Sequence, residues 1–279
     1  MRQENDRFIL FLYGTVFGRS LLKLIQKLHA DRLIVRFLRS RCSRFFTARY
    51  VKRNRIPISR EELRQYASFR DFFARKRKLT VTDLIPEHLI SPCDGWLSVY
   101  PITEGSSFAV KGSRYRVEDL LKDPVLAKNY AGGRCMIFRL CASDYHRYCY
   151  FDNGYQGENH EIPGVLHSVQ PIACETYPVY TLNRRCWCLM VTENFGPVVQ
   201  TEIGALIVGR VANIEGSSRF CRGMEKGHFE LAGSTIVLLF EPDRITLRPE
   251  LETLLGKERE VRVEQGMWIA SRFYGKGAE

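Results

Sequence analysis

The chain has 279 residues, 45% of them hydrophobic and 26% charged, a composition typical of one large or two small folded domains rather than of a disordered chain. Its net charge of +11 is unevenly placed, because residues 1–60 contain 15 Lys or Arg but only 3 Asp or Glu. The rest of the chain holds 27 of the 42 basic and 28 of the 31 acidic side chains, and this near-neutrality argues against nucleic acid as a partner.

The N-terminal region has a helical pattern over residues 8–46, with apolar residues on one side and Lys or Arg on the other. Its longest apolar run, residues 8–18, is about half of the ~20 residues that a membrane-spanning helix needs. Such helices suit the headgroup region of an anionic membrane, and the alternative is that the apolar side packs on the protein's own core. We favour the membrane interpretation.

A domain boundary is predicted where Ile56-Pro57-Ile58-Ser59 interrupts the helical pattern. Ser59 and Glu62 have the spacing of a capping box, which predicts a short helix reaching about Tyr66. We therefore expect a basic, amphipathic, membrane-associating helical region at residues 1–58 and a catalytic domain at residues 59–279.

Beyond residue 90 the pattern changes to short apolar runs separated by Gly, Pro, Asn and Asp, which is typical of β-strands. The expected strands are Trp96–Tyr100, Cys135–Leu140, Cys186–Thr192, Ala205–Val211, Thr235–Phe240, Ile245–Leu247 and Val261–Val263. The fold class is therefore predicted to be α+β, with N-terminal amphipathic helices followed by a compact, mostly antiparallel β domain.

The nine cysteines form no Cys-x-x-Cys pair. Cys186 and Cys188 could share one face of a strand, but no second pair of ligands matches them, so no metal site is expected. Reduced thiols in a reducing compartment fit this distribution best.

The segment with most chemical information is residues 227–241, where the step Gly233-Ser234-Thr235 directly precedes a strongly apolar strand. A Gly-Ser step alone would indicate only a turn. The whole segment, however, resembles the phosphatidylserine decarboxylase family, whose members carry a Gly-Ser-Thr or Gly-Ser-Ser step after an aromatic-containing stretch and before an aliphatic strand ending in Phe-Glu.

Further motifs fall in the order of that family, so the resemblance covers the chain from about residue 60 to the C-terminus. They are Ser68-Phe69-Arg70-Asp71-Phe72-Phe73-Ala74-Arg75, Ser91-Pro92-Cys93-Asp94-Gly95, Lys111-Gly112 followed by Tyr115, Asp144-Tyr145-His146-Arg147, and Ile162-Pro163-Gly164-Val165-Leu166.

The resemblance implies a pyruvoyl-dependent carboxy-lyase that converts phosphatidylserine to phosphatidylethanolamine and CO2. Loss of CO2 from an amino acid head group leaves a carbanion that ordinary side chains cannot delocalise, so an electrophilic cofactor is required. The ketone of a pyruvoyl group forms a Schiff base with the substrate amine and serves as that electron sink.

The resemblance also implies that the chain makes this cofactor from Ser234. The Ser234 hydroxyl attacks the Gly233 carbonyl, and the resulting ester is eliminated, so that the chain divides between these residues. The products would be a β chain of residues 1–233 and an α chain of residues 234–279, which remain associated. Because the predicted cleavage residues all lie beyond residue 90, we expect residues 1–55 to be dispensable for self-cleavage.

Asp94 matches the family's carboxylate, which orients a base for Ser234 in the manner of a serine-hydrolase triad. His146 matches the family histidine that acts near the substrate carboxylate in decarboxylation. Many relatives read Tyr-His-Arg-x-His, the last residue being the self-cleavage base, whereas this chain has Cys149 at that position. His167 is the leading substitute, and the alternative is that His146 serves both steps.

Two other substrates remain possible beside phosphatidylserine, namely a related amino-phospholipid and a smaller amino acid. The alternative from another class is a non-catalytic membrane-binding relative. The expected partners are phosphatidylserine, an anionic membrane surface and the two pieces of one precursor, and the cleaved unit could form a homodimer. The expected location is peripheral, on the cytoplasmic face of the cell membrane.

Overall fold

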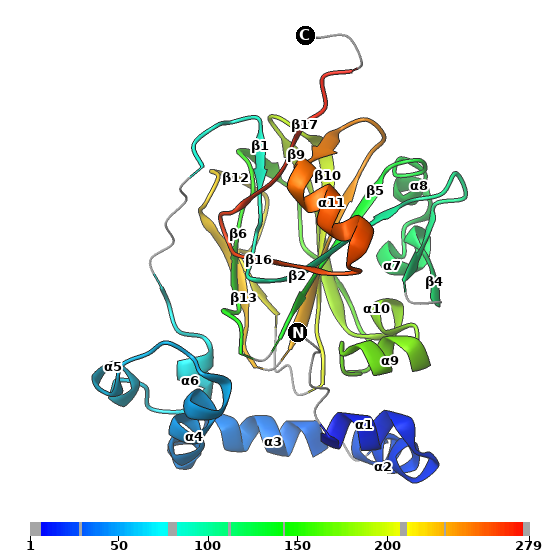
Figure 1. Cartoon of the computed structure of the whole chain (residues 1–279). Coiled ribbons are helices and arrows are strands. Elements are labelled where there is room, and N and C mark those ends of the chain that lie inside the picture. Colours follow the sequence, from blue (N-terminus) through cyan, green and yellow to red (C-terminus); the bar gives the residue numbers. More distant parts are fainter. Residues whose placement is uncertain are drawn as a thin grey trace.

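A computed structural model describes residues 7–27, 30–77, 83–110, 113–141, 143–206, 211–231 and 233–275. It consists of a group of N-terminal helices that lies across one end of a larger β domain (Figure 1). The N-terminal elements are α1 (Arg7–Gly14), α2 (Val16–Lys27), α3 (Ala30–Arg39), the short 3-10 helix η1 (Arg41–Ser43), α4 (Arg44–Asn54), α5 (Arg60–Arg64) and α6 (Phe69–Phe73). The predicted helical region is therefore confirmed.

The predicted helix break and the helix cap that follows it are also present. Arg55 adopts a left-handed conformation (φ 52°) and ends α4. The Ser59 hydroxyl then accepts a hydrogen bond from the Glu62 amide at 3.0 Å, which satisfies a free donor at the start of α5.

The β domain is built on one large antiparallel sheet. Its strands are β2 (Gly95–Pro101), β5 (Arg134–Leu140), β7 (Gly154–Gln156), β8 (His160–Ile162), β9 (Arg185–Thr192), β10 (Gly196–Ile203), β12 (Ser218–Phe220), β14 (Ser234–Phe240) and β16 (Val261–Val263). The strand order is β12-β7-β9-β10-β14-β5-β2-β16, and β8 pairs with β9. β14 lies in the middle, and all seven of its residues are buried.

Smaller sheets and short helices cover this sheet. One small sheet contains β6 (Arg147–Cys149), β11 (Val211–Asn213) and β13 (Glu225–Phe229), and another contains β1 (His88–Ile90), β15 (Ile245–Leu247) and β17 (Trp268–Arg272). A hairpin pairs β3 (Ser107–Val110) with β4 (Ser113–Arg116). The helices of this domain are α7 (Val117–Leu121), α8 (Pro124–Lys128), α9 (Pro171–Thr176), α10 (Val179–Leu182) and α11 (Pro249–Lys257). This arrangement confirms the predicted α+β fold class.

One predicted strand is wrong at its start. β10 ends at Ile203, so Ala205 and Leu206 of the expected strand Ala205–Val211 are not in a strand. Residues 207–210 lie outside the described residues, and Val211 begins β11. The register places this end, because Ile203 pairs with Arg185, the first residue of β9, and a further backbone hydrogen bond runs from the Gly204 amide to the Arg184 carbonyl at 3.0 Å before the two segments separate.

No single helix among the described residues is long and apolar enough to cross a bilayer. α1 and α2 together have the length and apolar composition of a membrane span, but the chain bends by 99° between them.

Candidate active site

The predicted cleavage position lies at one end of the central strand. Ser234 is the first residue of β14, its side chain is fully buried, and its Oγ has no hydrogen-bond partner among the described residues. A side chain on Gly233 would bring its Cβ to 3.2 Å from the Leu140 carbonyl oxygen. The step therefore combines a close backbone approach, which favours glycine, with a hydroxyl that is free to react.

Asp94 is brought to the same sheet end by the strand order. Ser234 pairs with Leu140 at the end of β5, and β5 in turn pairs with β2, which begins at Gly95. A Cβ on Gly95 would lie only 2.9 Å from the Arg139 carbonyl oxygen, so the tight contact between β2 and β5 requires glycine after Asp94. Asp94 directly precedes β2 and Ser234 begins β14, so only β5 lies between these two strands.

The Asp94 carboxylate is held by an arginine rather than by a histidine. Arg77 donates to both carboxylate oxygens, at 2.6 and 2.8 Å, and the Gln265 amide donates to Oδ1 at 2.9 Å. None of the Asp94 hydrogen bonds among the described residues involves a histidine. Sequence reasoning missed Arg77, because it stands in the basic run Arg75-Lys76-Arg77 and no motif distinguishes it.

Cys149 occupies a fully buried position close to this carboxylate. Its amide donates to the Pro92 carbonyl at 2.9 Å, and the Gln265 side chain donates to the same carbonyl at 3.2 Å. Burial raises the pKa of the Cys149 thiol to about 12. The thiol is therefore neutral at physiological pH and unsuited to act as a base.

His146 lies just before β6, with its ring packed 4.2 Å from the ring of Phe73. Its Nδ1 is 2.9 Å from the Asp144 carbonyl oxygen. Because a carbonyl only accepts, Nδ1 carries the proton in the neutral ring, which leaves a lone pair on Nε2. Burial lowers the pKa of His146 to about 4, and the buried Nε2 has no partner among the described residues. His146 thus presents a neutral ring whose Nε2 lone pair is unpartnered within the described residues.

His167 is held on both its backbone and its ring. Its backbone amide and carbonyl both bond to the Asn183 side chain, at 2.9 and 2.8 Å. The ring stacks on Tyr177 with centroids 4.5 Å apart, and Nδ1 lies 3.3 Å from the Tyr13 hydroxyl. Burial lowers the pKa of His167, so this ring too is neutral at physiological pH.

The segment that carries His167 also reaches the cleavage step. A side chain on Gly233 would lie 3.7 Å from Val169, two residues beyond His167. The structure thus gathers Ser234, Asp94 and both histidine segments around one sheet end, but it joins neither histidine to Ser234 Oγ or to Asp94 by a hydrogen bond within the described residues. The Lys111-Gly112 motif lies outside the described residues.

Two cavities differ in their relation to this site. A cavity of about 50 Å³ lies beside the Asp94–Arg77 pair and is lined by Arg77, Tyr145, Arg147, Tyr148, Cys149, Gly223, Glu225 and Gln265. The larger cavity, of about 530 Å³, lies between α4 and α5, away from the Gly233–Ser234 step. The larger of these two cavities is therefore not the one beside Asp94.

Comparison with known proteins gives a family. The family model described as phosphatidylserine decarboxylase matches residues 69–266. The chain is 38% identical over 268 residues to phosphatidylserine decarboxylase proenzyme 2 of Clostridium acetobutylicum, covering 95% of this chain and 92% of the relative. It is 34% identical over 284 residues to the phosphatidylserine decarboxylase proenzyme of Clostridium botulinum, covering 97% and 95%. A third relative with the same name, from Desulfitobacterium hafniense, is 34% identical over 264 residues, covering 91% and 89%. Since the family model covers most of the chain and the relatives align over nearly their full lengths, the chain belongs to the phosphatidylserine decarboxylase family.

Proposed function

We propose that the chain decarboxylates phosphatidylserine to phosphatidylethanolamine and CO2, using a pyruvoyl group made from its own Ser234. The observation that carries this proposal is the buried, unpartnered Ser234 hydroxyl directly after Gly233. It stands at the start of a core strand in a chain whose relatives are named proenzymes.

Self-cleavage needs no atoms beyond the chain and water. Ser234 Oγ attacks the Gly233 carbonyl carbon, so that an ester bond forms, the amide bond breaks and the hydroxyl proton passes to the Ser234 nitrogen. Removal of the Ser234 α-proton then expels the Gly233 carboxylate and leaves a double bond between Cα and Cβ. Water hydrolyses the imine tautomer of this residue, releases ammonia and leaves a ketone at position 234.

The residues present fit such a group. After cleavage, residues 234–279 would begin with β14, which is hydrogen-bonded along its length to β5 and β10 of the other piece. The two pieces would therefore stay together, and the new group would remain at the buried sheet end. A pyruvoyl group supplies a ketone that binds the substrate amine and withdraws electrons as CO2 leaves.

We assign the proton transfers to the two buried histidines. His167 is the proposed base for self-cleavage, supported by the approach of its segment to Gly233. His146 is proposed to carry a proton at the substrate α-carbon during decarboxylation, supported by its unpartnered Nε2. Asp94 remains the proposed carboxylate of this step, although the partner observed in the precursor is Arg77 rather than a histidine.

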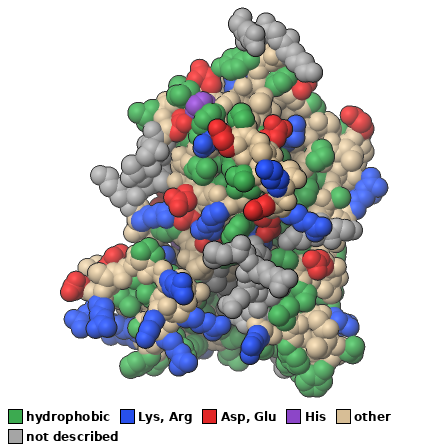
Figure 2. Space-filling view, viewed as in Figure 1, with side chains coloured by type: hydrophobic (Ala, Val, Ile, Leu, Met, Phe, Trp, Pro, Cys, Tyr) green, Lys and Arg blue, Asp and Glu red, His purple; other side chains and the backbone are tan. Residues whose placement is uncertain are grey.

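The N-terminal helices support a peripheral membrane location, which we propose to be the cytoplasmic face of the cell membrane. Large apolar side chains are exposed on these helices, including Phe17 at 73%, Leu33 at 70% and Phe45 at 87%. Lys and Arg side chains gather over the same part of the molecule, and apolar side chains line its lower edge (Figure 2). Apolar groups that insert below the headgroups, together with cations that contact anionic lipids, suit a helix lying on a membrane.

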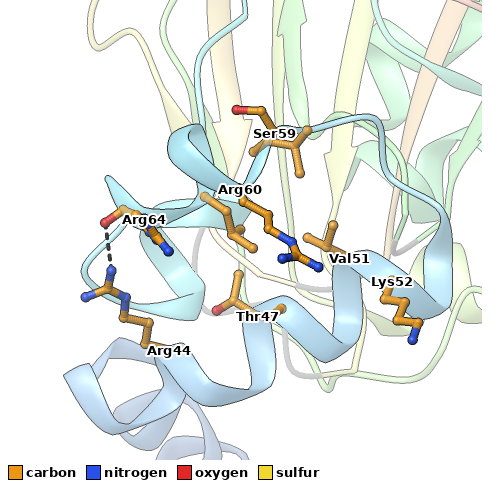
Figure 3. A pocket seen from close by; sticks show the side chains of 10 residues that line it. Arg44, Thr47, Val51, Lys52, Ser59, Arg60 and Arg64 are labelled. Atoms are coloured by element: carbon orange, nitrogen blue, oxygen red, sulfur yellow. Dashed lines mark hydrogen bonds between the residues drawn. The ribbon is translucent and has the colours of Figure 1, made fainter.

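The cavity between α4 and α5 has the chemistry for an anionic headgroup (Figure 3). Arg44, Lys52, Arg60 and Arg64 contribute charge, and Val51, Ile58 and Leu63 contribute apolar surface. Thr47 also lines this cavity, and its buried hydroxyl has no partner among the described residues. These groups support an anionic lipid surface as the partner of this region.

The test of the proposed function is the mass of the purified full-length chain. We expect a fragment of residues 234–279 from the wild-type protein and none from Ser234→Ala, whereas Ser217→Ala, a change at another serine, should leave cleavage unchanged. A fragment of that mass from Ser234→Ala would refute the mechanism.

Borohydride with phosphatidylserine should fix the lipid to the 234–279 piece. Equal trapping of free serine would support the smaller amino acid as substrate instead. Light scattering of the same preparation tests the predicted homodimer.

A further inference from the structure

Glu230, four residues before Ser234, is bound by two arginines, one from α3 and one from α6. Arg39 of α3 donates to Glu230 Oε2 at 2.6 Å, and Arg70 of α6 donates to Oε1 at 2.8 Å. The Glu230 side chain is only 6% exposed, although both arginines are more exposed. Burial opposes ionisation, but the hydrogen bonds and charges of the arginines hold the pKa of Glu230 below its ordinary value. Both carboxylate oxygens are thus fixed by groups from outside the β domain.

The neighbouring residue is held by apolar contacts from the same helices. Leu231 is fully buried in a cluster with Phe69 and Phe73 of α6. Val35 and Leu38 of α3 pack against this cluster. α3 and α6 therefore hold Glu230 by charge and Leu231 by packing. We use the term helical clamp for the ion pairs of Glu230 with Arg39 and Arg70 together with the packing of Leu231 against these two helices.

The helical clamp contacts the middle of the connection between Phe229 and Ser234, and both ends of this connection are held by hydrogen bonds. At one end, the Phe229 amide donates to the His146 carbonyl at 3.0 Å. At the other end, Ser234 pairs with Leu140. α6 contacts both the connection before Ser234 and His146, because Arg70 binds Glu230 and the Phe73 ring lies 4.2 Å from the His146 ring.

We infer that Glu230 is a positioning residue for self-cleavage, and that the helical clamp fixes the Gly233 carbonyl relative to the Ser234 hydroxyl. Attack of a hydroxyl on a carbonyl requires the two atoms to be held within a narrow range of distance and angle, and small displacements slow such reactions strongly. The other hydrogen bonds that the described residues of this connection make lie at its two ends, at Phe229 and Ser234. This inference rests on the proposed cleavage before Ser234.

The helical clamp reverses one expectation drawn from the sequence. From the sequence we expect residues 1–55 to be dispensable for self-cleavage, whereas the inference gives them a part in it, because they supply Arg39 and the apolar contacts of α3. We therefore expect the region that meets the membrane to contribute to maturation as well.

The inference is tested by timing the appearance of the 234–279 fragment in full-length chains made by cell-free synthesis. Glu230→Gln keeps the shape of the side chain but removes its charge, and we expect cleavage to slow at least tenfold. Glu230→Asp, which keeps the charge on a shorter side chain, should recover part of the rate. Arg39→Met and Arg70→Met should each slow cleavage in the wild-type chain but add little in the Glu230→Gln chain, because partners in one network are not additive.

The matched control is Arg36→Met, which removes an exposed arginine of the same helix that has no ion pair among the described residues. A normal rate is expected for this control. Melting temperatures measured in the Ser234→Ala background separate positioning from a general loss of stability, and we expect Glu230→Gln to change them little. Cleavage of Glu230→Gln at the wild-type rate, or equal slowing by Arg36→Met, would overturn the inference. A wild-type fragment that begins at another residue would instead refute the cleavage position.

Discussion

The Tyr13 hydroxyl lies 3.3 Å from Nδ1 of His167, although 154 residues separate the two in the chain. The same hydroxyl accepts a hydrogen bond from the Ser168 amide at 2.8 Å. Tyr13 belongs to α1, so the N-terminal helices contact the His167 segment as well as the residues before the cleavage position. When Nδ1 donates to Tyr13, the neutral ring of His167 has its lone pair on Nε2, where a base needs it.

Tyr13→Phe removes this hydroxyl without removing the ring. We expect slower self-cleavage, because the Ser168 amide loses its acceptor and Nδ1 of His167 loses the hydrogen-bond partner that holds the ring. Loss of a partner for a buried polar group usually costs about 1–3 kcal/mol, which corresponds to a rate reduction of roughly 5- to 150-fold if the whole effect falls on the transition state. Timed mass spectra of the precursor measure the rate. Tyr155→Phe alters a tyrosine whose side chain is 48% exposed, and it should cleave normally. Equal rates for the two variants would show that Tyr13 does not orient His167.

The two histidines should separate self-cleavage from decarboxylation. We expect His167→Ala to remain uncleaved and His146→Ala to cleave but to release CO2 slowly. Cys149→Ala should mature and react nearly as the wild type does, because a thiol whose pKa is raised to about 12 is no base at neutral pH. Mass spectrometry follows cleavage, and release of labelled CO2 from phosphatidylserine follows the reaction. If His167→Ala matures normally and His146→Ala does not, both roles belong to His146.

Local patterns were sufficient to predict the N-terminal helices, the Ser59–Glu62 cap, six of the seven strands that we expected and the position of Ser234 before a buried strand, but they missed β10, the neighbour of β14. These features depend on residues that are close in the sequence, such as an apolar period or a hydroxyl three residues before a glutamate. The misplaced strand Ala205–Val211, which begins after β10 has ended, shows the limit of this reasoning. Its apolar residues suit a strand, but the ladder ends at Ile203, where β9 begins, and pairing depends on a neighbour that local propensity does not specify.

The partners of the charged groups could not be predicted in the same way. The N-terminal region contains many arginines, and nothing local distinguishes Arg39, which binds Glu230, from Arg36, which has no ion pair among the described residues. Likewise, Arg77 reaches Asp94 only because the chain after α6 returns to the sheet end. Ion pairs between distant residues are decided by the packing of whole elements, so the family motifs located Asp94 but gave no sign of Arg77.

Membrane binding should depend on the exposed apolar side chains of the N-terminal helices. We expect Phe17→Ser combined with Phe45→Ser to weaken sedimentation with phosphatidylserine-containing vesicles, since both rings are largely exposed. Binding should also weaken as salt is added, because each basic residue near the surface contributes about 1 kcal/mol at physiological ionic strength. Val125→Ser is a suitable control, because this side chain is 76% exposed but lies on α8 of the β domain. Unchanged sedimentation of the double variant would mean that these helices do not meet the membrane.

The precursor should lose stability in mild acid because His146 is buried in its neutral form. Its pKa is about 4 in the folded chain against about 6.5 in the unfolded chain, so between these values the unfolded state binds the extra proton. The stabilisation is therefore present above about pH 6.5 and is lost as the pH falls towards 4. It amounts to about 2 kcal/mol between pH 7 and pH 5 for this one group, and the lowered pKa of His167 acts in the same direction. Urea unfolding of the uncleaved Ser234→Ala chain at the two pH values measures the loss. His146→Gln in that background cannot titrate, so its loss should be smaller by about that amount, whatever its absolute stability. An identical pH dependence for the two chains would mean that His146 titrates near its ordinary pKa, and its imidazole would then be partly charged under the conditions of the reaction.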